Sequence, residues 1–196
     1  MKAVIQRVVE ASVTVDDTTK GRIDFGLLVY LGVAHDDEKN DADWLAEKIP
    51  NLRIFDDSEG KMNLSLFDIV NQQNDKVNDI FVNQKHGIVN KDYVNHESNM
   101  VNKIFVNGNI SEVNKKSIGI LAISQFTLLG DARKGRRPSW AKAAPPEKAR
   151  ELYLYFMEKI RQNGLHCESG EFQARMKVSY TNEGPVTILL DSKENR

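Results

Sequence analysis

The sequence predicts a mixed α/β protein with a single domain, and three observations lead to this prediction. Short segments rich in valine, isoleucine and leucine recur near both ends of the chain, as in buried or half-buried strands. A longer segment over 146–163 places its apolar residues on one helical face. Between them, residues 68–116 form a polar stretch, and the remainder, about 150 residues, is a usual single-domain size. We therefore expect one domain over 1–196 that carries an insertion at 68–116.

The first 33 residues favour strands. Valine and isoleucine recur over 2–9 and alternate with polar residues over 11–15, which predicts β structure. The run FGLLVYLGV at 25–33 is apolar throughout and predicts a buried strand. The polar segment 16–20 between them is expected to be a turn.

A helix and a short strand are expected next. Residues 41–49 place apolar side chains at helical spacing, and Asp41 stands where an N-cap residue would. Pro50 should end that pattern. Residues 52–55 predict a short strand, and the acidic, glycine-containing segment 56–60 predicts the turn that closes it.

Residues 71–114 differ from the rest of the chain, with 11 asparagines in 44 residues and no amphipathic period. A repeat is present instead, because VNDIFVN at 77–83, VNKDYVN at 89–95 and VNKIFVN at 101–107 recur every twelve residues. Solenoid repeats are usually longer, and units this short and polar cannot bury a core of their own. The favoured interpretation is a mostly disordered surface loop. The alternative is a β-hairpin extension or a flap that contacts RNA.

The globular pattern returns after the insertion. The segment SIGILAISQF at 117–126 predicts a buried strand, and 130–138 is expected to be a loop. A long helix is predicted over 146–163, because Pro146 suits its first turn and Gly164 suits its end.

Two closing strands are expected at 176–180 and 186–190, around a turn at 181–185. This turn contains Gly184 and Pro185, a pair that a plain β-turn would explain. A tight turn with a cis bond is the alternative, since that form costs only about 0.5–1 kcal/mol before proline.

The abrupt polar end of the 117–126 strand is the first candidate site. Its apolar run gives way to Ser124, Gln125, Phe126 and Thr127. Backbone N–H groups become free at strand ends, which makes such ends natural places for a binding pocket. Ordinary capping of the strand explains the same residues equally well.

Four cations within residues 133–137 form the second candidate, on the predicted 130–138 loop. The whole chain has a net charge of −1, so RNA contacts would depend on a local patch of this kind. The segment is either a solvated charge run or a patch that holds phosphates.

Several classes of protein are disfavoured. The single cysteine, Cys167, excludes an intrachain disulfide framework and fits a reducing compartment, so a cytoplasmic location is expected. No apolar run reaches the length of a membrane span, and no membrane association is expected. His35 and His166 stand apart, and no phosphate-binding or zinc-binding motif is present, so we expect neither metal nor cofactor. Cys167 follows His166 directly, but chain neighbours do not make a nucleophile and its base.

Taken in order, the motifs of the chain resemble the D-aminoacyl-tRNA deacylase family. The resemblance begins at Met1 with IQRV followed by ASVTV and continues through GLLVYLGV, RIFDDSEGKMNLS, SQFTLLGD and KGRRPSW. It ends at MKVSYTNEGPVTILLD, and it covers nearly the whole chain outside 68–116. SQFT together with the NEGPVT segment is the most specific part. The asparagine-rich insertion is the main departure, and it leaves both motifs intact.

The resemblance implies a three-layer α/β/β fold and a homodimer with two shared active sites. Ser124, Gln125, Phe126 and Thr127 would form the catalytic pocket for the 3′-terminal adenosine of tRNA and its aminoacyl ester. The substrate-binding residues implied by the resemblance are Gly184, Pro185, Arg7 and Met176. Gly184 and Pro185, joined by a cis bond, would reach into the partner's pocket and reject L-aminoacyl-tRNA. Arg7 would hold that dipeptide, and Met176 would form a pocket wall.

The activity implied is chiral proofreading in translation quality control, the hydrolysis of D-aminoacyl-tRNA to D-amino acid and tRNA. Backbone N–H groups near Gln125 and Phe126 would stabilise the oxyanion, and the terminal ribose 2′-OH would assist the attacking water. Thr127 lacks a base in its motif, so we expect it to position the substrate. Three other functions remain open: a non-catalytic RNA-binding module, an esterase for small D-amino acid derivatives, and a structural oligomerisation protein.

Overall fold

The structure is a computed structural model that describes residues 1–83, 101–106, 109–114 and 117–194. In chain order its elements are β1 (Lys2–Val15), β2 (Thr18–Ile23), β3 (Phe25–Gly32), α1 (Lys39–Lys48), η1 (Ile49–Asn51), β4 (Phe55–Asp56), β5 (Met62–Leu64), α2 (Leu66–Asn83), β6 (Val101–Val106), β7 (Asn109–Asn114), β8 (Ile118–Ser124), η2 (Phe126–Leu129), α3 (Pro146–Gln162), β9 (His166–Ser169) and β10 (Lys177–Asp191). The α/β class is therefore confirmed. None of the described helices is long and apolar enough to cross a membrane.

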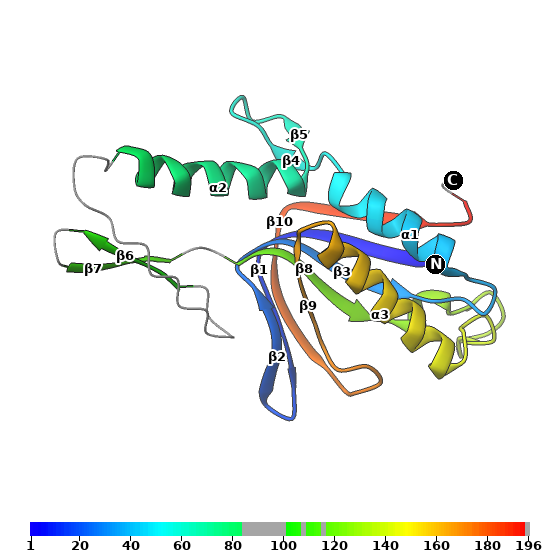
Figure 1. Cartoon of the computed structure of the whole chain (residues 1–196). Coiled ribbons are helices and arrows are strands. Elements are labelled where there is room, and N and C mark those ends of the chain that lie inside the picture. Colours follow the sequence, from blue (N-terminus) through cyan, green and yellow to red (C-terminus); the bar gives the residue numbers. More distant parts are fainter. Residues whose placement is uncertain (84–100, 107–108, 115–116, 195–196) are drawn as a thin grey trace.

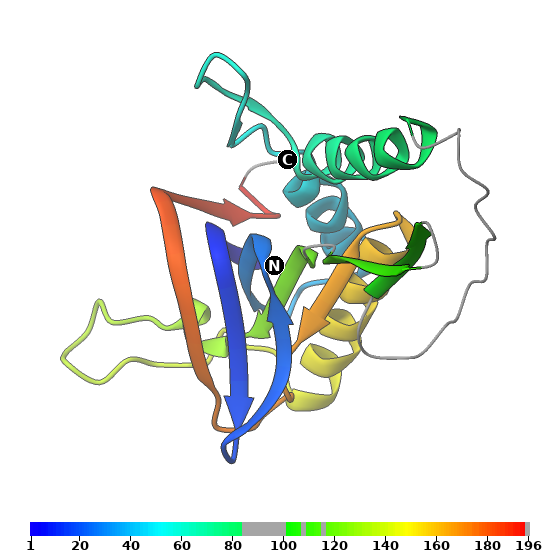
Figure 2. The ribbon, with the colours of Figure 1, turned by 90° about the vertical axis from the view of Figure 1, so that its left-hand side faces the viewer.

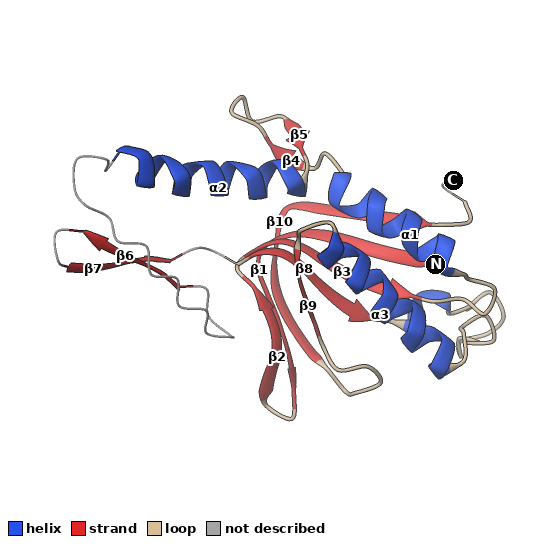
Figure 3. Cartoon of the chain, in the orientation of Figure 1, coloured by secondary structure: helices blue, strands red, loops and turns tan. Residues whose placement is uncertain are grey.

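A six-stranded mixed sheet forms the centre of the molecule (Figure 3). Its strands lie in the order β10-β1-β3-β8-β9, and β2 pairs with the second half of β1. The β1–β3 and β1–β10 pairs are antiparallel, whereas β8 runs parallel to both β3 and β9. The chain thus places β8, which follows the insertion, beside β3 near the start of the sequence.

Helices α1 and α3 cover one face of this sheet, as Figures 1 and 2 show. The predicted face of α3 packs there, with Leu152, Tyr153, Phe156, Met157 and Ile160 all buried. Its spacing follows the 3.6-residue period, which explains why the sequence located this helix to within one residue. The same face of the sheet buries alternate apolar residues of β3 and β8, among them Leu27, Val29 and Ile120, whereas Leu28, Leu121 and Ile123 belong to a second buried cluster.

Three local predictions are wrong. Residues 18–20, expected in a turn, are the exposed first residues of β2, and the turn before this strand is only Asp16 and Asp17, both with positive φ. Asp41 is the third residue of α1 and not its N-cap, which is Glu38. The Asp41 carboxylate accepts a hydrogen bond from the Glu38 backbone N–H at 2.8 Å. The short strand expected at 52–55 is β4, which begins only at Phe55.

The C-terminal segment is also simpler than predicted. The structure has one continuous strand, β10, where the sequence predicted two strands around a turn at 181–185. Gly184 and Pro185 therefore lie within a strand, joined by a cis peptide bond. The β1–β10 register shifts between Gln6 and Val8 and again between Val8 and Glu10, which accommodates the irregular stretch.

The described parts of the insertion have regular backbone. Helix α2 extends to Asn83, and β6 pairs with β7 in an antiparallel hairpin. The sequence favoured a mostly disordered loop over 68–116, with a hairpin extension as the alternative, and the choice between them stays a prediction. The repeat VNKDYVN at 89–95 lies outside the described residues. The treatment of 68–116 as an insertion into one domain stays a prediction.

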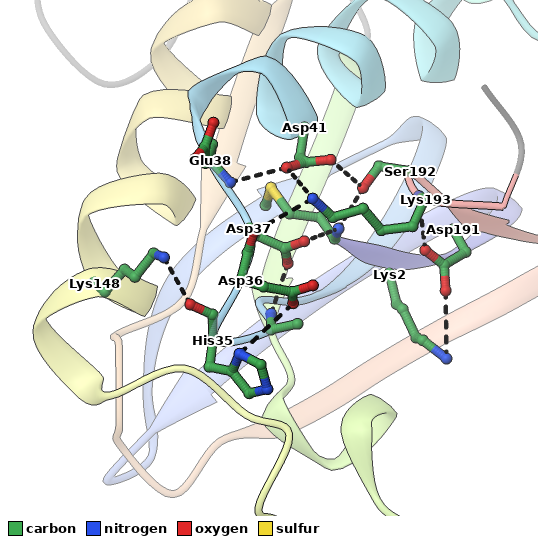
Figure 4. Close-up of polar contacts among 12 residues, drawn as sticks. Lys2, His35, Asp36, Asp37, Glu38, Asp41, Lys148, Asp191, Ser192 and Lys193 are labelled. Atoms are coloured by element: carbon green, nitrogen blue, oxygen red, sulfur yellow. Dashed lines mark hydrogen bonds and ion pairs between the residues drawn. The ribbon is translucent and has the colours of Figure 1, made fainter.

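A polar cluster at the start of the chain ties the two ends of the domain together (Figure 4). The α-ammonium group of Met1 is fully buried 2.6 Å from Asp37 Oδ1, and it also donates a hydrogen bond to Ser192 Oγ. Ser192 donates to Asp41 Oδ1 at 2.8 Å, and Lys193 Nζ lies 3.1 Å from Asp41 Oδ2. These contacts join β1, α1 and the segment after β10.

Candidate functional site

A cavity of about 560 Å³ opens at the end of β8. It lies between the last residues of β3 and β8, the start of α3 and the segment before β10. Its lining consists of Leu31, Val33, Ile123, Ser124, Gln125, Phe126, Ala143, Ala144, Pro146, Ala149, Tyr153, Phe172, Gln173, Ala174, Met176 and Val178. A mostly apolar cavity with a few polar groups at one strand end is the usual form of a small-ligand site.

The predicted SQFT segment forms one wall of this cavity. β8 ends at Ser124, and the Gln125 N–H donates to the Leu31 carbonyl of β3 at 2.8 Å, so this N–H is not available for an oxyanion. Phe126 and Thr127 then begin the 3₁₀ turn η2. The first N–H groups of a helical turn have no acceptor within it, which leaves those of Phe126 and Thr127 for a ligand.

Thr127 stands at the rim and is not among the lining residues. Its side chain is exposed, and its Oγ1 accepts a hydrogen bond from the Gln125 side-chain amide. An amide group that donates to a hydroxyl cannot remove its proton. Thr127 therefore has no base in this contact that would turn it into a nucleophile.

The inner part of the cavity is aromatic. Tyr153 of α3 packs against Phe172 with ring centroids 6.0 Å apart, and its hydroxyl donates to the Ala122 carbonyl at 2.8 Å. Burial raises the pKa of the Tyr153 phenol, which keeps it protonated. The described lining residues include no Asp, Glu, His, Lys, Arg or Cys. The cavity can bind and orient an apolar group, but its own side chains supply no general base.

Arg7, Gly184 and Pro185 form a separate group away from the cavity lining. Arg7 is almost completely buried, and its Nη1 donates to the Ile54 carbonyl at 2.7 Å. Gly184 and Pro185 are exposed on β10, which is an edge strand of the sheet. Gly184 has a φ of +116°, and a Cβ added there would lie 3.2 Å from Arg7 Nη2. The structure thus joins Arg7 to Gly184, but it does not bring either to the SQFT segment of the same chain.

Met176 lies in the wall of the cavity, and its role in substrate binding stays a prediction. The other lining residues were not predicted as site residues; among them are Tyr153, which the helix pattern explained as core, and Phe172 and Gln173, which follow β9 in a stretch without a predicted element. Only the three-dimensional arrangement brings these residues to the end of β8. No periodic signal in the sequence marks Phe172 or Gln173.

The cysteine and histidines offer no alternative centre among the described residues. Burial raises the pKa of the Cys167 thiol to about 12, so very little thiolate exists at neutral pH. His166 Nε2 lies 3.3 Å from Glu168 Oε1, and no group of three or more metal-binding side chains occurs in the described part. His86 and His96 lie outside it.

Comparison with known proteins gives a consistent result across the chain. The sequence model of the family described as D-Tyr-tRNA(Tyr) deacylase matches residues 4–77 and 80–191. A D-aminoacyl-tRNA deacylase of Koribacter versatilis is 44% identical over 194 residues, covering 99% of each chain. One from Thermosipho africanus is 45% identical with the same coverage, and one from Bacillus thuringiensis is 42% identical over 98% of this chain and 100% of its own.

Two solved structures share the fold. The first, titled c-Myc DNA Unwinding Element Binding Protein, has a TM-score of 0.68 and 31% sequence identity, covering 97% of this chain and 98% of its own. The second, titled as a probable eukaryotic D-amino acid tRNA deacylase, has a TM-score of 0.57 over 96% of this chain and 97% of its own. At 13% identity, that second likeness concerns the fold alone.

Proposed function

Since the chain belongs to the D-Tyr-tRNA(Tyr) deacylase family, we propose that it hydrolyses the ester bond of D-aminoacyl-tRNA and releases a D-amino acid and tRNA. The cavity at the end of β8 is the observation that carries this proposal. It is large enough for a nucleoside, its rim offers backbone N–H groups, and its described lining lacks an acid or base. Such a site suits an ester that is already activated and needs orientation more than proton transfer.

The proposed mechanism uses the substrate's own RNA. The N–H groups of Phe126 and Thr127 bind the oxyanion, a contribution of about 3–4 kcal/mol per donor in other enzymes. The Gln125 N–H takes no part, because it already bonds to Leu31. The 2′-OH of the terminal ribose positions the attacking water in the absence of a side-chain base. Thr127, held by the Gln125 amide, helps to position the adenosine.

Rejection of L-aminoacyl-tRNA is proposed to come from a second copy of the chain. Gly184 and Pro185 are exposed on an edge strand and do not line the cavity of their own chain. In a homodimer, the pair from each protomer would enter the other's cavity and exclude the Cβ of an L-residue. Exposed apolar side chains on the same strand, Tyr180 and Leu189, support its role as an interface. Pairing of two such sheets would also give the three-layer α/β/β arrangement.

A cytoplasmic location belongs to the same proposal, because a lone buried thiol fits a reducing compartment. There the enzyme would remove D-residues from charged tRNA before they reach translation.

The direct test compares D-Tyr-tRNA with L-Tyr-tRNA as substrates of the purified protein, following loss of the ester. We expect turnover of the D-substrate only, by a species of twice the chain mass in light scattering. Equal turnover of D-tyrosine methyl ester would instead indicate an esterase for small substrates. Tight tRNA binding without hydrolysis would indicate an RNA-binding module.

A further inference from the structure

The segment 131–139, here called the basic loop, concentrates positive charge on a chain that has no overall positive charge. Arg133, Lys134, Arg136 and Arg137 are all exposed, whereas the chain as a whole has a net charge of −1. The loop projects away from the sheet and helices at the left of Figure 2. Its cations therefore face solvent together, as a local positive patch.

The base of the basic loop is held in a defined conformation. Asp131 and Ser139 exchange two backbone hydrogen bonds of 2.9 Å, which close the loop like the end of a hairpin. The Asp131 carboxylate accepts two hydrogen bonds from Arg133 Nε, at 2.9 and 3.0 Å. These hydrogen bonds from Arg133 hold the pKa of Asp131 well below its usual range. Of the four cations, Arg133 thus stabilises the conformation of the loop.

The other three cations have no such role. Lys134, Arg136 and Arg137 form no ion pair with any residue in the described parts of the chain. Elsewhere on the surface, exposed cations such as Lys39, Lys61 and Lys177 lie within 3.3 Å of a carboxylate. Unpaired cations in a fixed loop are available for an anionic ligand without first losing a partner.

The basic loop stands directly beside the cavity. It follows η2, whose residue Phe126 lines the cavity, and it precedes Ala143 and Ala144, which also line it. The Phe126 ring contacts the Trp140 ring edge-on, with centroids 5.3 Å apart, so the segments before and after the basic loop pack on each other. A Cβ on Gly130 would lie 2.5 Å from the Trp140 ring, which shows how closely the loop is folded against η2.

We propose that Lys134, Arg136 and Arg137 bind backbone phosphates of the tRNA acceptor end, just before the terminal adenosine that enters the cavity. This inference rests on the proposed function, because it assumes that the cavity takes that adenosine. Phosphate contacts are independent of base sequence, so the loop would hold the acceptor end of any tRNA. It would raise affinity for the whole tRNA and leave the chemistry at the ester unchanged.

The test uses two substrates and two variants of equal charge change. The double variant Arg136→Gln/Arg137→Gln removes two loop cations, and Lys48→Gln/Arg150→Gln removes two exposed cations from α1 and α3. Each protein is assayed on D-Tyr-tRNA and on D-tyrosyl-adenosine, which has no phosphate, over a series of salt concentrations. Circular dichroism and light scattering verify that fold and assembly are retained.

For the loop variant, KM for D-Tyr-tRNA should rise about tenfold near physiological salt, and the slope of log(kcat/KM) against log[salt] should become shallower by about 1.4, the value for two single-strand phosphates. Rates on D-tyrosyl-adenosine and all rates of the control variant should stay within about twofold of the wild type. An unchanged KM for tRNA, or an equal loss on both substrates, would overturn the inference.

Failure of the proposed function is a separate outcome. If the wild type cleaves neither substrate, that function is wrong, and filter binding of uncharged tRNA decides the role of the loop. A dissociation constant that the loop variant does not change would then overturn the inference as well.

Discussion

Arg7 of β1 and Glu183 of β10 form an ion pair, with Nε 3.2 Å from Oε2. The arginine side chain is 6% exposed and the glutamate 40%, so the pair joins the interior to the surface immediately before Gly184. Arg7 also lies 3.3 Å from Asp56 Oδ1 and donates to the Ile54 carbonyl. One buried guanidinium therefore links the irregular part of β10 to the segment that enters β4.

Replacement of Arg7 should affect both stability and activity. Arg7→Met leaves the Ile54 carbonyl without its donor and frees Glu183, so we expect a loss of about 1–3 kcal/mol in the free energy of unfolding. Turnover of D-Tyr-tRNA should fall even under conditions in which the variant is fully folded, because the Arg7 side chain no longer lies beside Gly184. Glu183→Gln is the matched control, since an exposed ion pair contributes about 0–1 kcal/mol. Urea unfolding with parallel kinetics measures both, and equal effects of the two variants would contradict this role of Arg7.

Gly184→Ala should depress activity while leaving the fold intact. An added Cβ would lie 2.7 Å from Val186 Cγ2, and the φ of +116° is one that L-residues rarely adopt. The backbone at 184–185 must shift, and we expect D-substrate turnover to fall by more than about tenfold. Gly60→Ala provides a comparison, because Gly60 also has a positive φ but nothing within 4 Å of the added Cβ. Unaltered kinetics for Gly184→Ala would show that this pair does not contact the substrate.

Thr127→Ala should retain most activity. The Thr127 hydroxyl accepts a hydrogen bond from the Gln125 amide, and we expect a rate loss of less than about tenfold, as for a positioning group without a base. Ala149→Phe, which fills the cavity from α3, should abolish turnover in the same assay. Detection of an acyl group on Thr127 by mass spectrometry would refute this assignment.

Acid should destabilise the domain through Asp41. Burial alone would raise the pKa of this carboxyl, but hydrogen bonds from the Glu38 backbone, Ser192 and Lys193 lower it to about 2. Because the pKa is lower in the folded state, the stabilisation is complete above about pH 4, is lost as the pH falls toward 2, and amounts to about 2 kcal/mol. Asp41→Asn should flatten the stability curve between these pH values. A curve as steep as that of the wild type would exclude Asp41 as the titrating group.

The insertion should be dispensable for folding. The first residues of α2 pack on the core, with Leu66 fully buried and Phe67, Ile69 and Val70 against it. Replacing 71–114 with a short Gly/Ser linker keeps these contacts, so unfolding free energy should change by about 1 kcal/mol or less. D-specific turnover should persist. A variant that aggregates would show that the repeats contribute to the structure.

Much of the fold follows from local patterns in the sequence. The strands at 25–33 and 117–126 were predictable because continuous apolar runs of this length are typical of buried strands, and the helix at 146–163 because its apolar residues follow the helical period. The start of β2 was not predictable, since its first three residues are polar and exposed and resemble a turn. The continuity of β10 was not predictable, because Gly184 and Pro185 usually interrupt a strand. Register shifts between β1 and β10 accommodate them here.

The candidate site was predictable only in part. Ser124–Phe126 and Met176 were located by resemblance to a family and lie in the cavity wall. Phe172 and Gln173 were not, because their position depends on how the chain returns from β9 to β10 and on no local period. The occupied N–H of Gln125 was also beyond the sequence, since it reflects the parallel pairing of β3 and β8.

Because Cys167 is buried, its reaction with a thiol reagent can report when this part of the protein opens. The thiol is 4% exposed, and its backbone carbonyl accepts hydrogen bonds from Arg161 of α3 at 2.8 and 3.1 Å. A thiol reagent can reach it only when α3 separates from β9. The labelling rate should therefore follow the population of the opened state. Denaturant should raise this rate more steeply when the opening exposes more surface. Since the chain has no second cysteine, the signal reports only the contact between α3 and β9.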